Sequence, residues 1–275
     1  MIKMNKMGNT GQKGKTNDEL ERIIKNICIQ AGENLVEKAF HIESLAWKEK
    51  DDPVTNLDKE TEAMIITDIS QHVNANFYGE EYGITDNKSR INIYIDPIDG
   101  TKSFIRKEFL SSVSIAADKS GELFFGCVYD FMKNIFYYAN DKGAFLARTG
   151  QDEILSIPLK DAPIFSKPAI SFSNDEYYRE LLKKTVDARN QMGSVALSMA
   201  QLAAGSYDGL IMYPYKKNGL TDICDIAAGY YIMKQSGILV KNYELKDYNY
   251  RDPNHGIVAL RHENAKKILA LIERK

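Results

Sequence analysis

The chain has 275 residues, of which 44% are hydrophobic and 27% are charged, and its formal net charge is −2. These values match ordinary globular usage, and the length suffices for one large domain or two smaller ones around a sizeable core. The nearly balanced charge gives no sign of a nucleic-acid polymer or a membrane surface as partner. No apolar run approaches the roughly 20 residues that a membrane-spanning helix needs.

The few cysteines and histidines exclude several kinds of site. Cys28, Cys127 and Cys224 form no closely spaced pair, so we expect a reduced, cytoplasmic setting without a disulfide framework. The four histidines form no His-x-x-x-His pair, which argues against a zinc site. A Gly-x-Ser-x-Gly elbow and a P-loop are also missing from the sequence.

Residues 1–15 are rich in Lys, Gly and Asn, and we expect them to form a disordered N-terminal tail. They lack the apolar centre of a secretory signal, so export is not expected. A short arm that attracts phosphate is the alternative. The run Thr16-Asn17-Asp18-Glu19 predicts a capping box, and apolar residues at helical spacing follow from Leu20 to Leu35.

Two acidic clusters come next. Thr55 is expected to cap a helix over about residues 58–72, with Asp58 in its first turn. The second cluster is Gly79-Glu80-Glu81, which follows a short apolar segment. Each cluster alone is typical of a solvated surface. Together they would crowd carboxylates around one point, an arrangement that needs cations to neutralise it.

The most informative segment is Ile91–Thr101, an alternating apolar run that ends in Asp96-Pro97-Ile98-Asp99-Gly100-Thr101. A strand over 91–95 delivers Asp96 to its carboxyl end, where ligands of open α/β sheets usually bind. Gly100 permits close approach of the backbone to a ligand. Paired oxygen ligands beside free backbone N–H groups suit a hard divalent cation that holds a phosphate. An ordinary turn is the alternative, because Asp, Pro and Gly are common turn formers.

The remaining pattern predicts two halves that pack as one unit, since no Pro- or Gly-rich linker separates them. Residues 16–150 form an α+β half with the metal-binding motifs, and we expect an antiparallel sheet with helices on one side. Residues 151–275 form an α/β half. Predicted strands lie around 111–118, 122–129, 134–139, 168–172, 208–213 and 238–240, and predicted helices around 175–187, 194–204, 222–236 and from about 263.

A further carboxylate, Asp225, stands near the start of the predicted 222–236 helix, where an acidic residue is common. With it, four segments appear in a fixed order: Pro53–Asp58, Gly79–Glu81, Asp96–Thr101 and Asp225–Gly229. In content and order these segments resemble the motifs of the inositol monophosphatase superfamily of magnesium-dependent, lithium-sensitive phosphatases. The resemblance implies the layered αβαβα sandwich of the inositol monophosphatase and fructose-1,6-bisphosphatase type, with the metal site between the two halves.

The resemblance also implies about two or three Mg²⁺ ions. Asp96 would bridge two ions. Glu80 and the backbone carbonyl of Ile98 would complete one site, and Asp99 and Asp225 would complete the other. Such a pair of ions polarises a phosphoryl group and orients a water, so no protein nucleophile is required.

The nucleophile implied by the resemblance is a metal-bound water, oriented by Glu80 or Thr101. Asp58 is expected to hydrogen-bond Thr101 and to set the direction of its hydroxyl. The amides of Gly100 and Thr101 would bind phosphate oxygens at the start of a helix over 101–105.

The substrate-binding residues are less clearly marked. The string Asp-Gly-Thr-Lys-x-Phe-Ile resembles branches that hydrolyse 3′-phosphoadenosine 5′-phosphate or histidinol phosphate, so Lys102, with Lys216 and Lys217, would bind a second phosphate. A solvated lysine is the alternative. The segment Gly193–Ser198 resembles one that lines the substrate pocket, or it is only a packed helix start. This segment and two later positions give four further expected contacts: Ser194, Ala196, Asp208 and Asn218. Asp225 is expected to contact the substrate as well as the metal.

Three departures from the family pattern concern the substrate. Cys224 replaces the usual tryptophan before the motif aspartate, and Gln235–Ile238 replaces the usual Glu-Ala-Gly-Gly. Residues 213–221 form a longer segment than in the inositol-specific branch, which has an acidic residue near Asn218.

The sequence therefore predicts a cytoplasmic Mg²⁺-dependent phosphomonoesterase for a small phosphorylated polyol such as inositol monophosphate, with a homodimer as a further expectation. Three activities are alternatives within the class: 3′(2′),5′-bisphosphate nucleotidase, histidinol-phosphatase and fructose-1,6-bisphosphatase. A haloacid-dehalogenase phosphatase uses a covalent aspartyl phosphate; its two aspartates are two residues apart, whereas Asp96 and Asp99 are three apart. A non-catalytic metal or phosphate sensor is the alternative outside enzymes.

Overall fold

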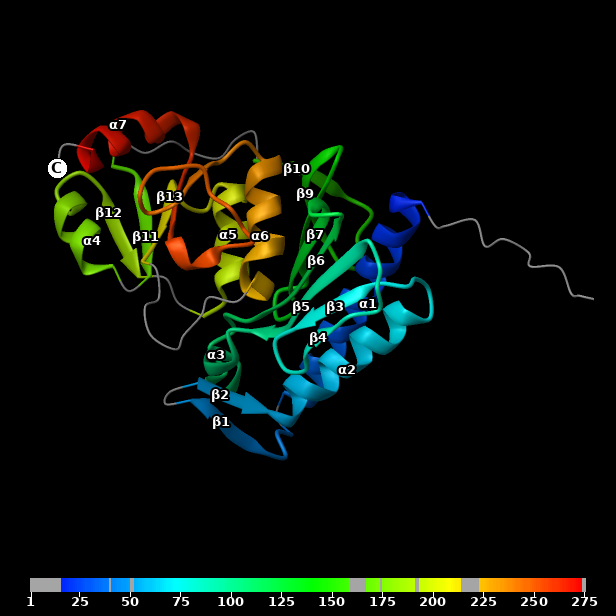
Figure 1. The fold of residues 1–275 in the computed structure, drawn as a ribbon. Helices are drawn as coiled ribbons and strands as arrows, with labels where there is room; N and C mark the ends of the chain where they lie inside the picture. Colours follow the sequence, from blue (N-terminus) through cyan, green and yellow to red (C-terminus); the bar gives the residue numbers. More distant parts are fainter. Residues whose placement is uncertain are drawn as a thin grey trace, which may run out of the picture.

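The computed structural model describes residues 16–39, 41–49, 52–158, 167–173, 175–190, 193–213 and 223–273. These residues form five alternating layers of helix and sheet (Figure 1). The order is helix pair, eight-stranded sheet, helix pair, five-stranded sheet, helix pair. The αβαβα sandwich predicted from the sequence is confirmed. The predicted N-terminal tail lies outside the described residues.

The first helical layer comprises α1 (Asn17–Lys38) and α2 (Asn56–Ser70). The Thr16 hydroxyl accepts a hydrogen bond from the Glu19 amide at 3.3 Å and caps α1, as predicted. The helix α2 begins slightly earlier than predicted, because Thr55 and Asp58 form a reciprocal capping box. Both helices bury their apolar faces against the first sheet. Within the described residues no helix has both the length and the apolar character needed to cross a bilayer.

The first sheet has the strand order β10-β9-β8-β7-β6-β5-β3-β4. Its strands are β3 (Asn76–Gly79), β4 (Gly83–Thr85), β5 (Ile91–Asp99), β6 (Ser112–Lys119), β7 (Glu122–Asp130), β8 (Ile135–Asn140), β9 (Gly143–Arg148) and β10 (Ile154–Ile157). Neighbours are antiparallel except β3 and β5, which are parallel. The carboxyl ends of β3 and β5 therefore meet at one edge of the sheet.

The expectation of helices on one side of this sheet is wrong. The strand β5 is buried on both faces: Ile93 and Ile95 face α1 and α2, and Tyr94 faces α5 and α6. The second face also presents Ala116 and Val128 to the same helices. The sequence shows alternation at this strand but not that both of its faces are covered, because a tyrosine is compatible with an exposed or a buried face.

The C-terminal half is built on the second sheet, with the strand order β12-β11-β13-β15-β14. Its strands are β11 (Ala169–Ser173), β12 (Asp187–Asn190), β13 (Gly209–Met212), β14 (Leu239–Lys241) and β15 (Ile257–Leu260). The outer helices are α4 (Glu176–Leu182) and α7 (His262–Ile272), the central helices are α5 (Val195–Ala204) and α6 (Ile223–Gln235), and a short 3₁₀ helix, η1, spans Pro253–His255. The central helices share one buried core with both sheets, so the two halves pack against each other.

Two small elements complete the surroundings of the site. A hairpin of β1 (Leu45–Glu49) and β2 (Asp52–Thr55) precedes α2, and α3 (Thr101–Arg106) follows β5 directly. Figure 1 shows α3 beside this hairpin, at the edge where the two halves meet. The sequence pattern does not predict this hairpin, because Pro53 and the charged residues around it obscure the alternation of a strand.

Candidate metal centre and active site

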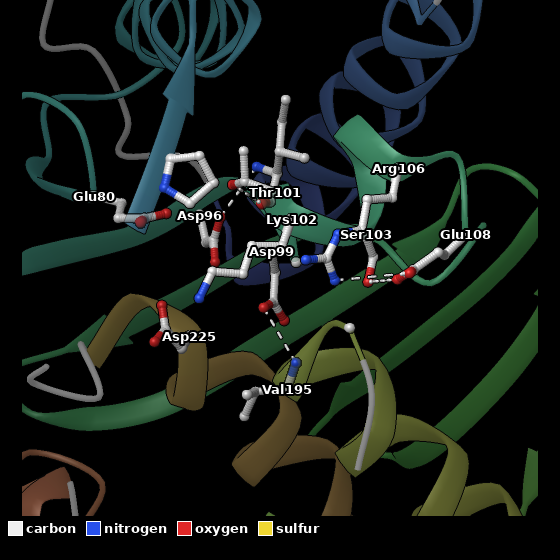
Figure 2. A pocket seen from close by; sticks show the side chains of 14 residues that line it. Glu80, Asp96, Asp99, Thr101, Lys102, Ser103, Arg106, Glu108, Val195 and Asp225 are labelled. Carbon is white, nitrogen blue, oxygen red and sulfur yellow. Dashed lines mark hydrogen bonds and ion pairs between the residues drawn. The ribbon is translucent and has the colours of Figure 1, made fainter. Parts of the chain in front are cut away.

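Three carboxylates converge at the edge between the two halves. Glu80 follows β3, Asp96 lies in β5, and Asp225 lies in the first turn of α6. One oxygen from each lies within 4.8 Å of the others. Figure 2 shows the three side chains on one side of a cavity of about 430 Å³. Three carboxylate oxygens at this separation could bind one metal ion together.

Strand pairing explains why Glu80 and Asp96 are neighbours. The parallel register aligns Gly79 with Ile95, and the Glu80 amide donates a hydrogen bond to the Ile95 carbonyl at 3.2 Å. The next residue of each strand is therefore one of the two carboxylates. Asp225 arrives from the other half because α6 packs across the same sheet. The Cys224 thiol donates to the Tyr78 carbonyl at 3.1 Å and ties the start of α6 to β3.

The electrostatics of the cluster call for positive charge. Asp96 is only 2% exposed, and burial, followed by repulsion from Glu80 and Asp99, raises its pKa well above the usual range. A divalent cation would offset this repulsion, and an all-oxygen donor set is the kind that Mg²⁺ prefers. Within the described residues, the Lys48 ammonium of the hairpin lies 2.7 Å from Glu80 and also pairs with Glu81.

Asp99 has a different environment although it lies on the same strand. Its carboxylate accepts hydrogen bonds from the Ser194 hydroxyl at 2.6 Å, the Val195 amide at 3.1 Å and the Ala196 amide at 2.6 Å. It thus binds the first turn of α5 while it also lines the cavity. Burial raises the pKa of Asp99 to about 6, although these hydrogen bonds act in the opposite direction.

Thr101 and Asp58 meet as expected. The Thr101 hydroxyl lies 3.0 Å from Asp58 Oδ1 and 3.0 Å from the Ile98 carbonyl. The other Asp58 oxygen accepts from the amide and the hydroxyl of Thr55, at 2.8 and 2.6 Å. The capping box of α2 therefore fixes the carboxylate that holds the Thr101 hydroxyl. Burial raises the pKa of Asp58.

Gly100 allows the two halves to approach each other. Its φ of 85° lies in the left-handed region, and a Cβ at this position would lie 2.7 Å from the Ser194 nitrogen. A larger residue would push α3 away from the start of α5. Gly100, Thr101 and Lys102 all line the cavity.

The remaining predicted contacts divide into three cases. Ser194 caps α5 by accepting from the Leu197 amide at 2.9 Å, and Ala196 is buried, so both reach the site through Asp99. Asp208 does not line the cavity: it precedes β13, is 3% exposed, and accepts from the Ala169 amide at 2.9 Å. Asn218, Lys216 and Lys217 lie outside the described residues.

The structure adds residues that the sequence analysis did not single out. Lys48 reaches Glu80 from the hairpin, Arg106 lines the cavity from the last turn of α3, and Glu108 lines it just after α3. Arg106 stands four positions after Lys102, so helical spacing alone places the two on one face of the predicted helix. The position of Lys48 carries no comparable signal, because it depends on how the hairpin folds back.

Nearly the whole chain matches a known protein family. A family model described as the inositol monophosphatase family covers residues 16–275. The chain belongs to this family. Membership makes it a phosphatase, a phosphoric monoester hydrolase of a metal-dependent family.

Similar proteins carry several different names. A fructose-1,6-bisphosphatase of Pyrococcus furiosus is 31% identical over 223 residues, which cover 79% of this chain and 82% of the relative. An inositol-1-monophosphatase of Bacillus subtilis is 28% identical over 88% of this chain and 91% of the relative. The solved structure of the extragenic suppressor protein suhB from Bartonella henselae has a TM-score of 0.79 at 21% identity, over 93% of this chain and 99% of that one. The last likeness concerns the fold alone.

Proposed function

We propose that the chain is a Mg²⁺-dependent phosphomonoesterase that hydrolyses a small phosphorylated metabolite, such as a polyol monophosphate of the inositol phosphate type. The observation that carries this proposal is the convergence of Glu80, Asp96 and Asp225 within 4.8 Å at the edge of the cavity. Family membership supplies the reaction class. The donor atoms at the site are all carboxylate or carbonyl oxygens, which favour a hard divalent cation such as Mg²⁺.

The residues that would hold the ions are Glu80, Asp96, Asp99, Asp225 and the carbonyl of Ile98. When bound, divalent cations supply charge neutralisation at the phosphoryl oxygens and make a coordinated water more acidic. The repulsion among these carboxylates, which raises the pKa of Asp96, supports this proposal because added positive charge would relieve it.

Thr101 is placed to orient the attacking water. Its hydroxyl lies 3.0 Å from both Asp58 Oδ1 and the Ile98 carbonyl, and donation to either oxygen leaves the lone pairs of Oγ1 free to accept a proton of the water. Asp58 is itself fixed by Thr55, so the hydroxyl cannot turn freely. Glu80 is the second group able to accept from this water, because it lies at the opposite side of Asp96 in the same cavity.

The test is a phosphate-release panel with Mg²⁺ and with EDTA. It compares inositol 1-phosphate, 3′-phosphoadenosine 5′-phosphate, histidinol phosphate and fructose 1,6-bisphosphate. We expect release that requires Mg²⁺ and is inhibited by lithium at elevated concentration. A preference of about a hundredfold in kcat/KM, near 2.7 kcal/mol, decides the substrate branch. A folded protein that releases phosphate from none of these compounds would instead support the non-catalytic sensor.

A further inference from the structure

A buried glutamate that the proposed mechanism does not use lies against the turn that carries Glu80. Glu62, in α2, is 0% exposed, and carboxylates are almost never fully buried unless they are paired. Its partners are two backbone amides. Glu62 Oε2 accepts from the Glu81 amide at 2.8 Å, and Oε1 accepts from the Tyr82 amide at 2.9 Å. Both oxygens of the carboxylate therefore bind the turn between β3 and β4.

These hydrogen bonds complete the support of the turn at residues 80–82. The Glu80 amide donates to the Ile95 carbonyl at 3.2 Å, and the next two amides donate to Glu62. One amide is thus held by β5 and two are held by α2. Figure 2 shows the Glu80 carboxylate turned toward Asp96. The direction of this side chain depends on a backbone that is fixed on both sides of it.

The close approach of Glu62 also explains the glycine at position 79. A Cβ at Gly79 would lie 1.8 Å from Glu62 Oε1 and 2.4 Å from its carboxyl carbon. The φ of Gly79 lies outside the left-handed region, so the backbone itself would accept an alanine. The group that an alanine would displace is therefore the Glu62 carboxylate.

The energetics of Glu62 connect it with the metal site. Burial raises the pKa of Glu62, the Glu81 and Tyr82 amides act in the opposite direction, and the charge of Glu80 raises it further. The two charge-assisted hydrogen bonds offset part of the cost of burial. The repulsion between Glu62 and Glu80 remains in the metal-free protein, and a cation bound by Glu80 would relieve it.

We propose that Glu62 is a positioning residue for the metal site, because its carboxylate holds the 80–82 turn so that Glu80 reaches the same ion as Asp96 and Asp225. The inference rests on the proposed function, in which Glu80 binds the ion. Glu62 does not line the cavity, so it acts only through the turn. Groups that orient metal ligands typically change metal affinity by about tenfold to a hundredfold when they are removed.

The test measures Mg²⁺ affinity by calorimetry, without substrate. Glu62→Ala should weaken the affinity by about tenfold to a hundredfold, since the turn loses both of its contacts with α2. Glu21→Ala is the matched control. Glu21 is a buried glutamate of α1 whose carboxylate accepts from the Asn140 side chain at 2.9 Å, away from the cavity. This variant should unfold at a lower temperature but bind Mg²⁺ like the wild type.

A second variant separates position from charge. Gly79→Ala keeps the charge of Glu62 but displaces its carboxylate from the turn, so it should also weaken Mg²⁺ affinity, by about tenfold. In the double variant Gly79→Ala/Glu62→Ala the space is open, and the loss should equal that of Glu62→Ala alone. If only the negative charge of Glu62 mattered, Gly79→Ala would bind Mg²⁺ normally.

Hydrogen exchange checks the contact in the metal-free protein. In EDTA, the amides of residues 80–82 should exchange faster in Glu62→Ala than in the wild type, because two of them lose their acceptor. Glu21→Ala should leave exchange in this segment unchanged. Equal exchange in Glu62→Ala and the wild type would mean that Glu62 does not hold the turn, and would overturn the proposal.

The affinity measurements separate this inference from the function on which it rests. If the wild type binds Mg²⁺ and Glu62→Ala and Gly79→Ala bind it equally well, the positioning role is overturned and the proposed function stands. If the wild type binds no Mg²⁺ at millimolar concentration, both are overturned. An equal loss in Glu21→Ala would indicate general destabilisation, and losses that add in the double variant would indicate independent effects; either result would overturn the role of Glu62.

Discussion

The N-terminal and C-terminal halves build the candidate site in different ways. The N-terminal half places Glu80 and Asp96 by strand register and Asp58 by a capping box, so short local segments fix these side chains. The C-terminal half contributes Asp225 and the first turn of α5 only through packing across the shared core. The N-terminal half therefore holds its carboxylates in place by local structure, whereas the C-terminal half adds Asp225 only when the two halves pack together.

The largest expected effect tests the pre-formed half. Asp96→Asn should lower kcat/KM by on the order of a thousandfold, because the central charge of the group is lost. The midpoint of thermal unfolding should not fall, since the amide oxygen still accepts from the Ile98 amide and one repelling charge disappears. Phosphate release and a thermal melt in EDTA measure the two quantities.

Asp86→Asn is the matched control, because Asp86 is an exposed aspartate that pairs with Lys88 outside the cavity. It should retain full activity. If Asp96→Asn turned over substrate at the wild-type rate, the site would have to be sought elsewhere.

A smaller effect is expected at Thr101, where the N-terminal half orients the water. Thr101→Ala should lower kcat by about a hundredfold and change Mg²⁺ affinity much less. Thr101→Ser keeps the hydroxyl beside Asp58 and should retain most of kcat. Steady-state kinetics and a calorimetric Mg²⁺ titration distinguish the two quantities; an unchanged kcat in Thr101→Ala removes the hydroxyl from the mechanism.

The same contrast between the halves shows how far the sequence could be interpreted. The helix caps at Thr16 and Thr55 follow from local patterns, and the structure contains both. The contact between Thr101 and Asp58, which are 43 positions apart, was expected only from the family resemblance, and the structure contains it as well. The helix coverage of both faces of the first sheet and the contact of Asp99 with α5 depend on residues far apart in the chain, 95 positions in the case of Ser194 and Asp99. Local periodicity carries no information about such docking.

Lys48 and Asp208 illustrate the same limit of local sequence patterns. Lys48 reaches Glu80 only because β1 folds back on β2, and no motif marks that position. Asp208 was expected near the substrate, but its carboxylate instead joins β13 to β11 through the Ala169 amide. A lone aspartate before a glycine fits both roles, and only the second sheet's register distinguishes them.

The next effect concerns pH and compares the protein with and without Mg²⁺. The pKa of Asp99 is raised from 3.8 to about 6, so at pH 5 the folded metal-free protein retains a proton that the unfolded chain has lost. The contribution of Asp99 to the free energy of unfolding should therefore fall as pH rises from about 4 to 6. Mg²⁺ requires the ionised form, so its affinity should rise by up to about tenfold per pH unit in this window for each displaced proton.

Thermal melts at pH 5 and pH 7.5, with EDTA or with Mg²⁺, measure this linkage. The increase in unfolding temperature caused by Mg²⁺ should be larger at pH 7.5. An equal increase at both pH values would mean that Mg²⁺ binding does not displace a proton from Asp99.

The smallest effect tests the docking of the C-terminal half. Ser194 caps α5 and donates to Asp99, so Ser194→Ala should lower the free energy of unfolding by about 1 kcal/mol. It should also lower kcat/KM a fewfold, because Asp99 loses one of the three donors that hold it at the edge of the cavity. Urea unfolding and phosphate release measure both. Thr16→Ala removes the cap of α1, far from the cavity, and should cost similar stability without a change in kcat/KM. If both variants lost stability and neither lost activity, the first turn of α5 would support the fold of the C-terminal half but not the position of Asp99.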